Sequence, residues 1–151
     1  MKRTLAALLL ASAAHTADAA PQEWILDLGH AYVGWEIDHM GLSRTVGQFR
    51  SFDGTFLIDE DMPENSQITF TVDARSVDSN HIGRDNHLRN PDYLNADAFP
   101  RITFASTQVE MLTPTTGKLH GDLTMLGVTA PLELDFKMVR DRTFPAFLPN
   151  Y

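Results

Sequence analysis

The sequence contains no cysteine. Without a thiol, the chain cannot form a disulfide framework, a lipid anchor on an N-terminal Cys, a Cys nucleophile or a thiolate metal site. It also lacks any run of about 20 apolar residues, so the sequence predicts no membrane-spanning helix. Basic residues are few, 12 against 20 acidic ones, and the net charge is −8 at pH 7. A field of this sign repels nucleic acid and anionic lipid surfaces and favours solubility.

The first segment has the pattern of a secretory signal peptide. Lys2 and Arg3 precede an apolar run over residues 5–14, and small residues then flank a cleavage position after residue 19. A mitochondrial transit peptide is the competing interpretation, but it would be amphipathic and rich in Arg and Ser, and this segment is neither. We therefore expect residues 1–19 to be removed and residues 20–151 to fold as one exported domain.

Apolar and polar residues alternate with a period of two along most of the remaining chain. The clearest segments cover residues 32–38, 68–73, 101–105, 119–125 and 132–138. Weaker patterns predict further strands at residues 24–26, 45–50, 53–58 and 108–112. Alternation of this kind indicates strands with one buried face. Many short strands separated by Gly-, Pro- and Asp-containing turns predict an antiparallel sandwich or barrel.

One polar segment interrupts the strands between residues 80 and 99. Its composition is compatible with a helix, and Pro91 and Pro100 would end one. We expect a short helix over residues 83–90 and a further turn over residues 96–99. Insertions of this length in all-β folds often cover one end of the sheet.

A series of short motifs resembles a known family. The motifs are Asp27-Leu28-Gly29-His30, Val33-Gly34, His39-Met40-Gly41, Gly47-x-Phe49, Phe52-x-Gly54, Arg84-Asp85-x-His87-Leu88-Arg89-x-Pro91, Phe99-Pro100-x-Ile102-Thr103-Phe104, Gly121-Asp122-Leu123-Thr124, and Gly127-Val128-Thr129 followed by Pro131. In this order and spacing the sequence resembles the YceI-like family of periplasmic proteins over about residues 24–138. The resemblance implies an elongated, antiparallel, lipocalin-like barrel in the periplasm that holds an isoprenoid chain, such as a polyprenyl lipid or a quinone tail. It implies no catalytic activity.

The sequence departs from the family pattern in two places. Ala31 stands where the family usually has Ser after the early His, which removes one polar contact. Family members also continue beyond the position of Arg140 with further strands, whereas this chain ends in a Pro-containing tail over residues 142–151. We therefore expect C-terminal strands to be missing from the barrel. An open edge favours pairing with another chain, so a homodimer is expected as one outcome.

The inward-facing side chains of the expected barrel form the candidate ligand-binding wall. These are Val33, Trp35, Ile37, His39, Phe56, Phe70, Ile102, Phe104, Leu119, Gly121, Leu123, Leu134 and Phe136. Gly121 is of particular interest, because it leaves a gap between two leucines. The alternative is that these residues form an ordinary packed core, which is the usual role of an apolar strand face.

Arg84 and His87 are the candidate headgroup residues. They lie three positions apart on the expected helix and so share a face, from which they would receive an anionic or carbonyl headgroup at the barrel mouth. Asp85 and Arg89, four apart, are expected to form an intrahelical ion pair, which is the alternative use of this segment. We expect structural hydrogen-bonding roles for four other histidines, which are His30, His39, His81 and His120.

Three functions remain open from the sequence. The preferred one is a periplasmic carrier of an isoprenoid-type lipid, with no catalytic residue, metal or cofactor and no nucleic-acid partner. The second is an enzyme that acts on such a lipid with His39 or His87 as acid or base. The third is a non-binding stress or interaction protein that recruits a partner through an open sheet edge.

Overall fold

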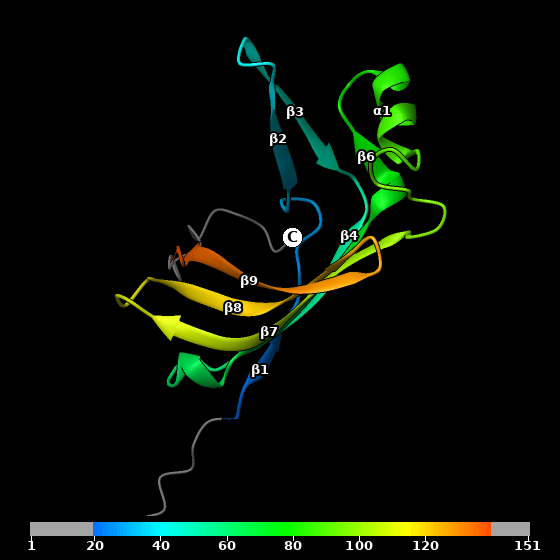
Figure 1. The fold of residues 1–151 in the computed structure, drawn as a ribbon. Helices are drawn as coiled ribbons and strands as arrows, with labels where there is room; N and C mark the ends of the chain where they lie inside the picture. The colour runs from blue at the N-terminus through cyan, green and yellow to red at the C-terminus, as the bar shows by residue number, and fades with distance from the viewer. Residues whose placement is uncertain (1–19, 140–151) are drawn as a thin grey trace, which may run out of the picture.

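The computed structural model describes residues 20–139, and the expected signal segment 1–19 and the tail from residue 140 lie outside them. The chain forms nine strands and one α-helix in this range (Figure 1). In order these are β1 (Gln22–Trp24), β2 (Val33–His39), β3 (Ser43–Phe49), β4 (Phe52–Ile58), β5 (Gln67–Asp73), β6 (Val77–Asp78), α1 (Ile82–Arg89), β7 (Arg101–Met111), β8 (Thr116–Met125) and β9 (Val128–Lys137). Two 3₁₀ turns, Pro63–Asn65 and Ala74–Ser76, precede β5 and β6.

The strands form two antiparallel sheets. The larger sheet has the order β1-β4-β5-β7-β8-β9, and the smaller one has the order β2-β3-β6. An antiparallel all-β fold with one short helix is therefore confirmed. Among residues 20–139, β9 pairs only with β8 and β2 pairs only with β3, so the two sheets do not close into a barrel. Figure 1 shows the β2–β3 hairpin and α1 projecting together beyond one edge of the curved larger sheet.

The register places the apolar residues of neighbouring strands on one face of the larger sheet. Phe70 lies opposite Phe104, and Phe104 lies opposite Leu123. The buried centre of this face is a cluster of Phe104, Val109 and Leu119. Alternation in the sequence predicted this face correctly, because side chains on successive strand positions point to opposite sides.

The strand boundaries differ from the expected ones at β7. The strands expected at residues 101–105 and 108–112 are a single long strand, β7, with a shift of register between Ser106 and Gln108. At this irregularity the Ser106 hydroxyl accepts a hydrogen bond from the backbone N–H of Ile68 at 2.8 Å. A β-bulge changes which side chains face inward, and the sequence pattern therefore broke there.

Local chemistry explains the turns that place the helix and the last hairpin. The imidazole Nδ1 of His81 accepts a hydrogen bond from the Arg84 N–H at 3.1 Å and so caps α1, which agrees with the expected helix to within one residue. Leu126 and Gly127, both with positive φ, form the tight turn between β8 and β9. Pro131 lies in β9, a strand with one described neighbour, where a missing N–H is tolerated.

Candidate functional site: two apolar hollows

The first hollow lies on the apolar face of the larger sheet and has a volume of about 440 Å³. Its apolar walls come from Trp24, Ile58, Pro63, Ile68, Val109, Met111, Leu119, Phe136, Met138 and Val139, and its polar rim from Asp59, Glu60, Ser66 and Lys137. Several of these side chains also pack on the buried cluster. The hollow therefore extends the core outward instead of lying apart from it.

The second hollow, of about 370 Å³, is formed by the smaller sheet, by α1 and the segment after it, and by the ends of β7 and β8 of the larger sheet. Its lining is almost entirely apolar and consists of Trp35, Ile37, Phe49, Val77, Leu88, Tyr93, Leu94, Ile102 and Met125. The side chains of α1 and of the segment after it thus cover one end of the sheet, as the composition of the insertion suggested.

The structure divides the candidate wall residues into three groups. Leu119 and Phe136 line the first hollow, and Trp35, Ile37 and Ile102 line the second. Phe70, Phe104 and Leu123 belong to the packed core, and Phe56 stacks edge-on against Phe70 at 6.4 Å between ring centroids. The remaining members line neither hollow: Val33 pairs with Phe49, Leu134 is partly exposed, and His39 is exposed at the end of β2.

The gap expected at Gly121 is filled by an aromatic ring. A Cβ atom at this position would lie 2.4 Å from the Phe104 ring and 2.4 Å from the backbone oxygen of Ala105. The same arrangement recurs at Gly47, where a Cβ would meet the Trp35 ring at 2.2 Å. These glycines let an aromatic side chain lie flat across the neighbouring strand. The open volume lies elsewhere on the apolar face.

The candidate headgroup residues Arg84 and His87 line neither apolar hollow. The Arg84 guanidinium donates from Nε to the Ser79 hydroxyl at 2.7 Å and from Nη2 to the Ser79 carbonyl at 2.6 Å. His87 lies 3.6 Å from the Asp92 carboxylate, and its ring contacts Tyr93 edge-on, with 4.9 Å between ring centroids. Arg84 instead borders a polar hollow on the other face of the smaller sheet, together with Arg44 and Arg50.

The expected Asp85–Arg89 ion pair does not form. Asp85 is buried, and its Oδ1 accepts hydrogen bonds from the backbone N–H of Ser79 at 2.7 Å and from the Ser79 hydroxyl at 2.5 Å. Arg89 donates to the carbonyls of Arg75 and Val77. The expectation was wrong because both side chains fasten α1 to the chain around β6, and buried backbone groups there need these partners.

Sequence reasoning missed several lining residues. Ile58, Ile68 and Met111 lie on predicted strands with the correct alternation, so the signal that would have found them was present. Tyr93 and Leu94 follow α1 in a segment with no periodic pattern. Their place against the second hollow depends on tertiary packing, and no local signal indicates it.

Asp59 at the rim of the first hollow has a pKa below its ordinary value. Its side chain is buried and accepts hydrogen bonds from the backbone N–H groups of Met62 at 2.8 Å and Asp61 at 3.1 Å. The bond from Met62 is the main cause of the lowered pKa, and the amide of Asn65 adds to it. Ionised Asp59 therefore holds the loop between β4 and β5 against the hollow.

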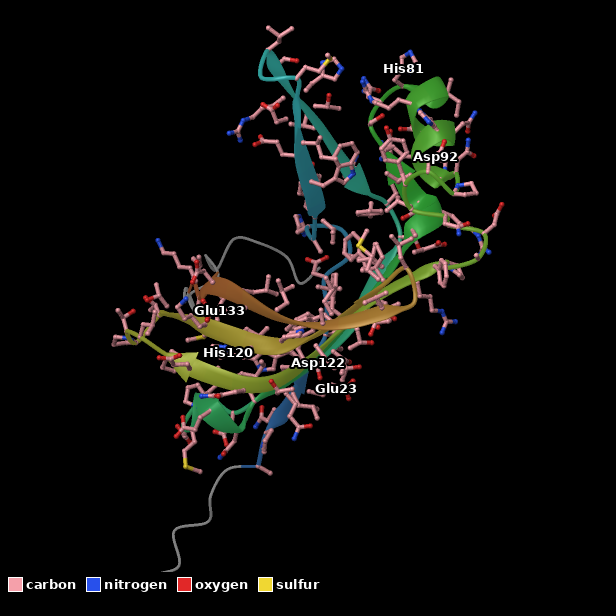
Figure 2. The ribbon with its side chains drawn as sticks, viewed as in Figure 1. Glu23, His81, Asp92, His120, Asp122 and Glu133 are labelled. Atoms are coloured by element: carbon pink, nitrogen blue, oxygen red, sulfur yellow. The ribbon has the colours of Figure 1, made fainter. Side chains whose placement is uncertain are left out.

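A charged network covers the opposite face of the larger sheet. His120 on β8 lies across from Glu133 on β9, as Figure 2 shows, and contacts Glu110 at 3.3 Å. The hydrogen bond between Lys118 and Glu133 raises the pKa of the lysine and lowers that of the carboxylate. In the described range, His30 bonds to Asp27 and His81 caps α1, so three histidines have the hydrogen-bonding roles expected of them.

The part of the chain that the structure describes contains neither a metal-binding cluster nor a membrane-spanning helix. Within residues 20–139, no three His, Asp or Glu side chains are grouped so that they could hold a metal ion. None of the helices in this range is long and apolar enough to cross a bilayer.

Comparison with known proteins identifies the family. The model of the YceI-like domain matches residues 24–147. A UPF0312 protein of Ectopseudomonas mendocina is 38% identical over 147 residues, which cover 96% of this chain and 77% of that protein. Protein YceI of Shigella flexneri is 40% identical over 142 residues, which cover 92% of this chain and 74% of that protein.

Solved structures agree with this assignment. A Campylobacter jejuni YceI protein superposes with a TM-score of 0.60 at 32% identity, covering 76% of this chain and 67% of that one. Burkholderia cenocepacia BcnA shares the fold, with a TM-score of 0.72 at 19% identity over 76% of this chain and 72% of that one. The motifs, the antiparallel strand order and these matches agree, and the chain belongs to the YceI-like family.

Proposed function

We propose that this protein is a periplasmic carrier that holds a long isoprenoid-type lipid, a polyprenyl chain or a quinone tail, against its apolar inner face. The observation that supports the proposal is the pair of apolar hollows, of about 440 and 370 Å³, the first on the larger sheet and the second lined by residues of both sheets. Volumes of this size are typical of small-molecule sites. The periplasmic location rests on the signal-like residues 1–19 and on the family resemblance.

The hollows suit a hydrocarbon chain better than a polar substrate. Trp35, Ile37, Leu88 and their neighbours surround the second hollow with almost no polar surface. Burying a prenyl chain stabilises the complex by about 0.8 kcal/mol per CH₂-sized group, so a long tail binds without a hydrogen bond. Because neither hollow places a histidine on its wall, no observation favours the enzyme alternative.

In this proposal Arg84 and His87 still bind the headgroup, but from beside the second hollow and not from its wall. Neither side chain touches an apolar hollow, but Leu88 on the same helix and Tyr93 beside His87 both do. A chain held in the second hollow therefore ends close to α1, and its headgroup lies within reach of that helix.

The test is native mass spectrometry of protein expressed as the precursor and purified without detergent, followed by organic extraction. We expect a discrete added mass that extracts as a polyprenyl compound. Met111→Trp fills the first hollow and should lower the bound fraction severalfold. Leu112→Trp adds the same ring one position along, on the exposed side, and serves as the matched control. Protein that carries no lipid and takes up no added isoprenoid would contradict the proposal.

A second candidate, a homodimer or partner complex, rests on the edge of β9. Within residues 20–139 this strand has one neighbour, and unpaired N–H and C=O groups on an edge can extend a sheet into another chain. Leu134→Lys puts a charge in that strand and should abolish concentration-dependent association in analytical ultracentrifugation. A wild-type monomer at every concentration would contradict this candidate.

A further inference from the structure

Two of the described residues that line the second hollow carry a polar side-chain group. These groups are the indole N–H of Trp35 on β2 and the hydroxyl of Tyr93 in the segment after α1. All the other lining residues are Ile, Leu, Val, Phe or Met. In a wall of this kind a single donor decides which ligands are favoured, because a few placed polar groups give an apolar pocket its specificity.

The indole N–H of Trp35 has no hydrogen-bond partner. Among the side chains of residues 20–139, Nε1 of Trp35 is the only buried nitrogen or oxygen atom without one. The N–H of a buried tryptophan usually finds an acceptor, and leaving it unpaired is unfavourable. The position of this donor on the wall of a hollow therefore points to an acceptor that comes from outside the chain.

One acceptor of the chain itself lies close to the Trp35 ring. The ring lies flat over Gly47, where a Cβ atom would be 2.4 Å from the ring carbon Cε2, and the carbonyl oxygen of Asp78 is 2.7 Å from the same point. Although Cε2 is bonded to Nε1, the indole does not donate to this oxygen. The backbone that the fold brings to the ring thus leaves the N–H unpaired.

Water is a poor substitute for the missing acceptor. Nε1 is buried, so bulk solvent does not reach it. An isolated water molecule inside a protein is held by two to four hydrogen bonds, and the lining of this hollow has almost no polar surface to supply them. Tyr93, the other polar side chain, is 50% exposed and packs its ring against His87.

We propose that Trp35 selects lipids with a neutral acceptor oxygen next to the apolar chain, such as the carbonyl of a quinone, and donates its N–H to that oxygen in the second hollow. The inference rests on the carrier proposal and narrows its ligand class. Trp35 is only half-buried, and its N–H gives up no hydrogen bond when the ring tilts toward the hollow. A ligand that brings an acceptor removes the penalty of the unpaired donor, whereas a pure hydrocarbon leaves it in place.

Charge separates this class from the other oxygen-bearing lipids. Burying a phosphate or diphosphate in an apolar hollow carries a large desolvation cost, and no Arg, Lys or His of the described chain lines this one. A carbonyl is much less costly to bury and needs a single donor. Its bond to Trp35 would leave the rest of the headgroup beside Tyr93 and so next to His87 on α1.

The indole signals in two-dimensional ¹⁵N–¹H NMR spectra of the full chain test the proposed bond. The chain has two tryptophans, so Trp24→Phe identifies the signal of Trp35. We expect farnesylacetone, an isoprenoid ketone, to shift the Trp35 proton downfield, because the N–H gains an acceptor. The matched hydrocarbon, with a CH₂ in place of the carbonyl, should cause no downfield shift. Farnesyl diphosphate should cause none either, since its charged group stays outside the hollow.

Competition between the ketone and the hydrocarbon measures the selection. With equal amounts of both present, native mass spectrometry gives the ratio of the two bound forms. Trp35→Phe keeps an aromatic ring without the N–H and should lower the ratio of bound ketone to bound hydrocarbon by about fivefold. Trp24→Phe makes the same change at the first hollow and should leave the ratio as in the wild type. Both ligands compete for the same folded molecules, so a less stable variant still gives a valid ratio.

The outcomes distinguish this inference from the carrier proposal. An unchanged ratio in Trp35→Phe, a Trp35 signal that the ketone does not move, or an equal downfield shift with farnesyl diphosphate would each overturn the inference alone. So would a Trp35 proton that is downfield and protected from exchange before any ligand is added, since the N–H would then bond to the protein itself. Uptake of neither the ketone nor the hydrocarbon would overturn both proposals.

Discussion

The two sheets of this protein are held in different ways. The larger sheet encloses a buried apolar cluster of Phe104, Val109 and Leu119, to which side chains of four strands contribute. In the smaller sheet Val77 on β6 is fully buried, whereas Trp35 and Ile37 on β2 remain partly or largely exposed. The smaller sheet is fastened to its surroundings by polar side chains, among them Asp85, Arg84 and Arg89.

The apolar packing of the larger sheet and the polar attachment of the smaller one suit two different roles, a fixed wall and a part that can open. Apolar burial is stable and non-directional, so the larger sheet provides a fixed wall for the first hollow. Hydrogen bonds at a partly exposed hairpin and helix can open locally at lower cost. The smaller sheet, α1 and the second hollow between them therefore form the part of the molecule in which a lipid could enter with least disruption.

The largest expected contrast comes from truncating one apolar side chain in each sheet. Leu119→Ala removes a side chain that is 7% exposed and should lower the free energy of unfolding by about 2–5 kcal/mol. Ile37→Ala removes one that is 54% exposed and should change it by about 0.5 kcal/mol. Urea unfolding followed by tryptophan fluorescence and circular dichroism measures both. Equal losses would show that β2 is packed as firmly as β8.

A smaller contrast is expected at the glycines that lie beneath aromatic rings. Gly121→Ala forces a Cβ against the buried Phe104 ring and the Ala105 carbonyl, and should cost about 1–3 kcal/mol. Gly47→Ala meets the Trp35 ring, which is only half-buried and so has more room to move. We expect a smaller loss there, measured as a shift of the urea midpoint. A larger loss for Gly47→Ala would show that the smaller sheet, and not the larger one, is packed more rigidly around its glycine.

Sequence alone predicted the strands and the helix of both regions well but their side-chain contacts poorly, for a physical reason. Alternation identified the inward faces of β5, β8 and β9 because burial acts on every second residue of a strand. It could not show that Phe104 fills the space above Gly121, since that contact depends on the register between two strands. Nor could it show that Asp85 bonds to Ser79 instead of Arg89. Polar contacts of this kind are set by tertiary placement, and i,i+4 spacing is only a weak guide to them.

The helix offers a local test of the polar attachment. Asp85→Ala leaves the buried N–H and hydroxyl of Ser79 without their acceptor, and should cost about 1–3 kcal/mol. We expect the loss to appear as faster amide hydrogen exchange in α1 and β6, with the strands of the larger sheet unchanged. Ile82→Ala, at a side chain of the same helix that is 72% exposed, is the control. Uniformly faster exchange across both sheets would mean that the two regions unfold as one unit.

The smallest effect concerns acid, and one carboxylate with a lowered pKa from each region makes the comparison. Asp59 in the larger region owes its low pKa mainly to the backbone N–H of Met62, and Asp78 in the smaller region to the backbone N–H of Asn80 and then to Arg50. A carboxylate whose pKa is lower in the folded state stabilises the fold above its ordinary value of 3.8, and this contribution is lost as the pH falls through the folded pKa. Asp59→Asn and Asp78→Asn should therefore destabilise the protein at neutral pH, and the difference from wild type should shrink in strong acid.

Salt then separates the two carboxylates. Asp59 is buried and bound by backbone and amide donors, so its contribution should resist added salt. Asp78 relies partly on Arg50, whose side chain is 66% exposed, and ions screen such a pair. We expect high salt to reduce the effect of Asp78→Asn and to leave that of Asp59→Asn in place, as judged from urea midpoints at neutral pH. A salt-insensitive Asp78 would show that the backbone N–H of Asn80, and not the Arg50 side chain, accounts for its contribution.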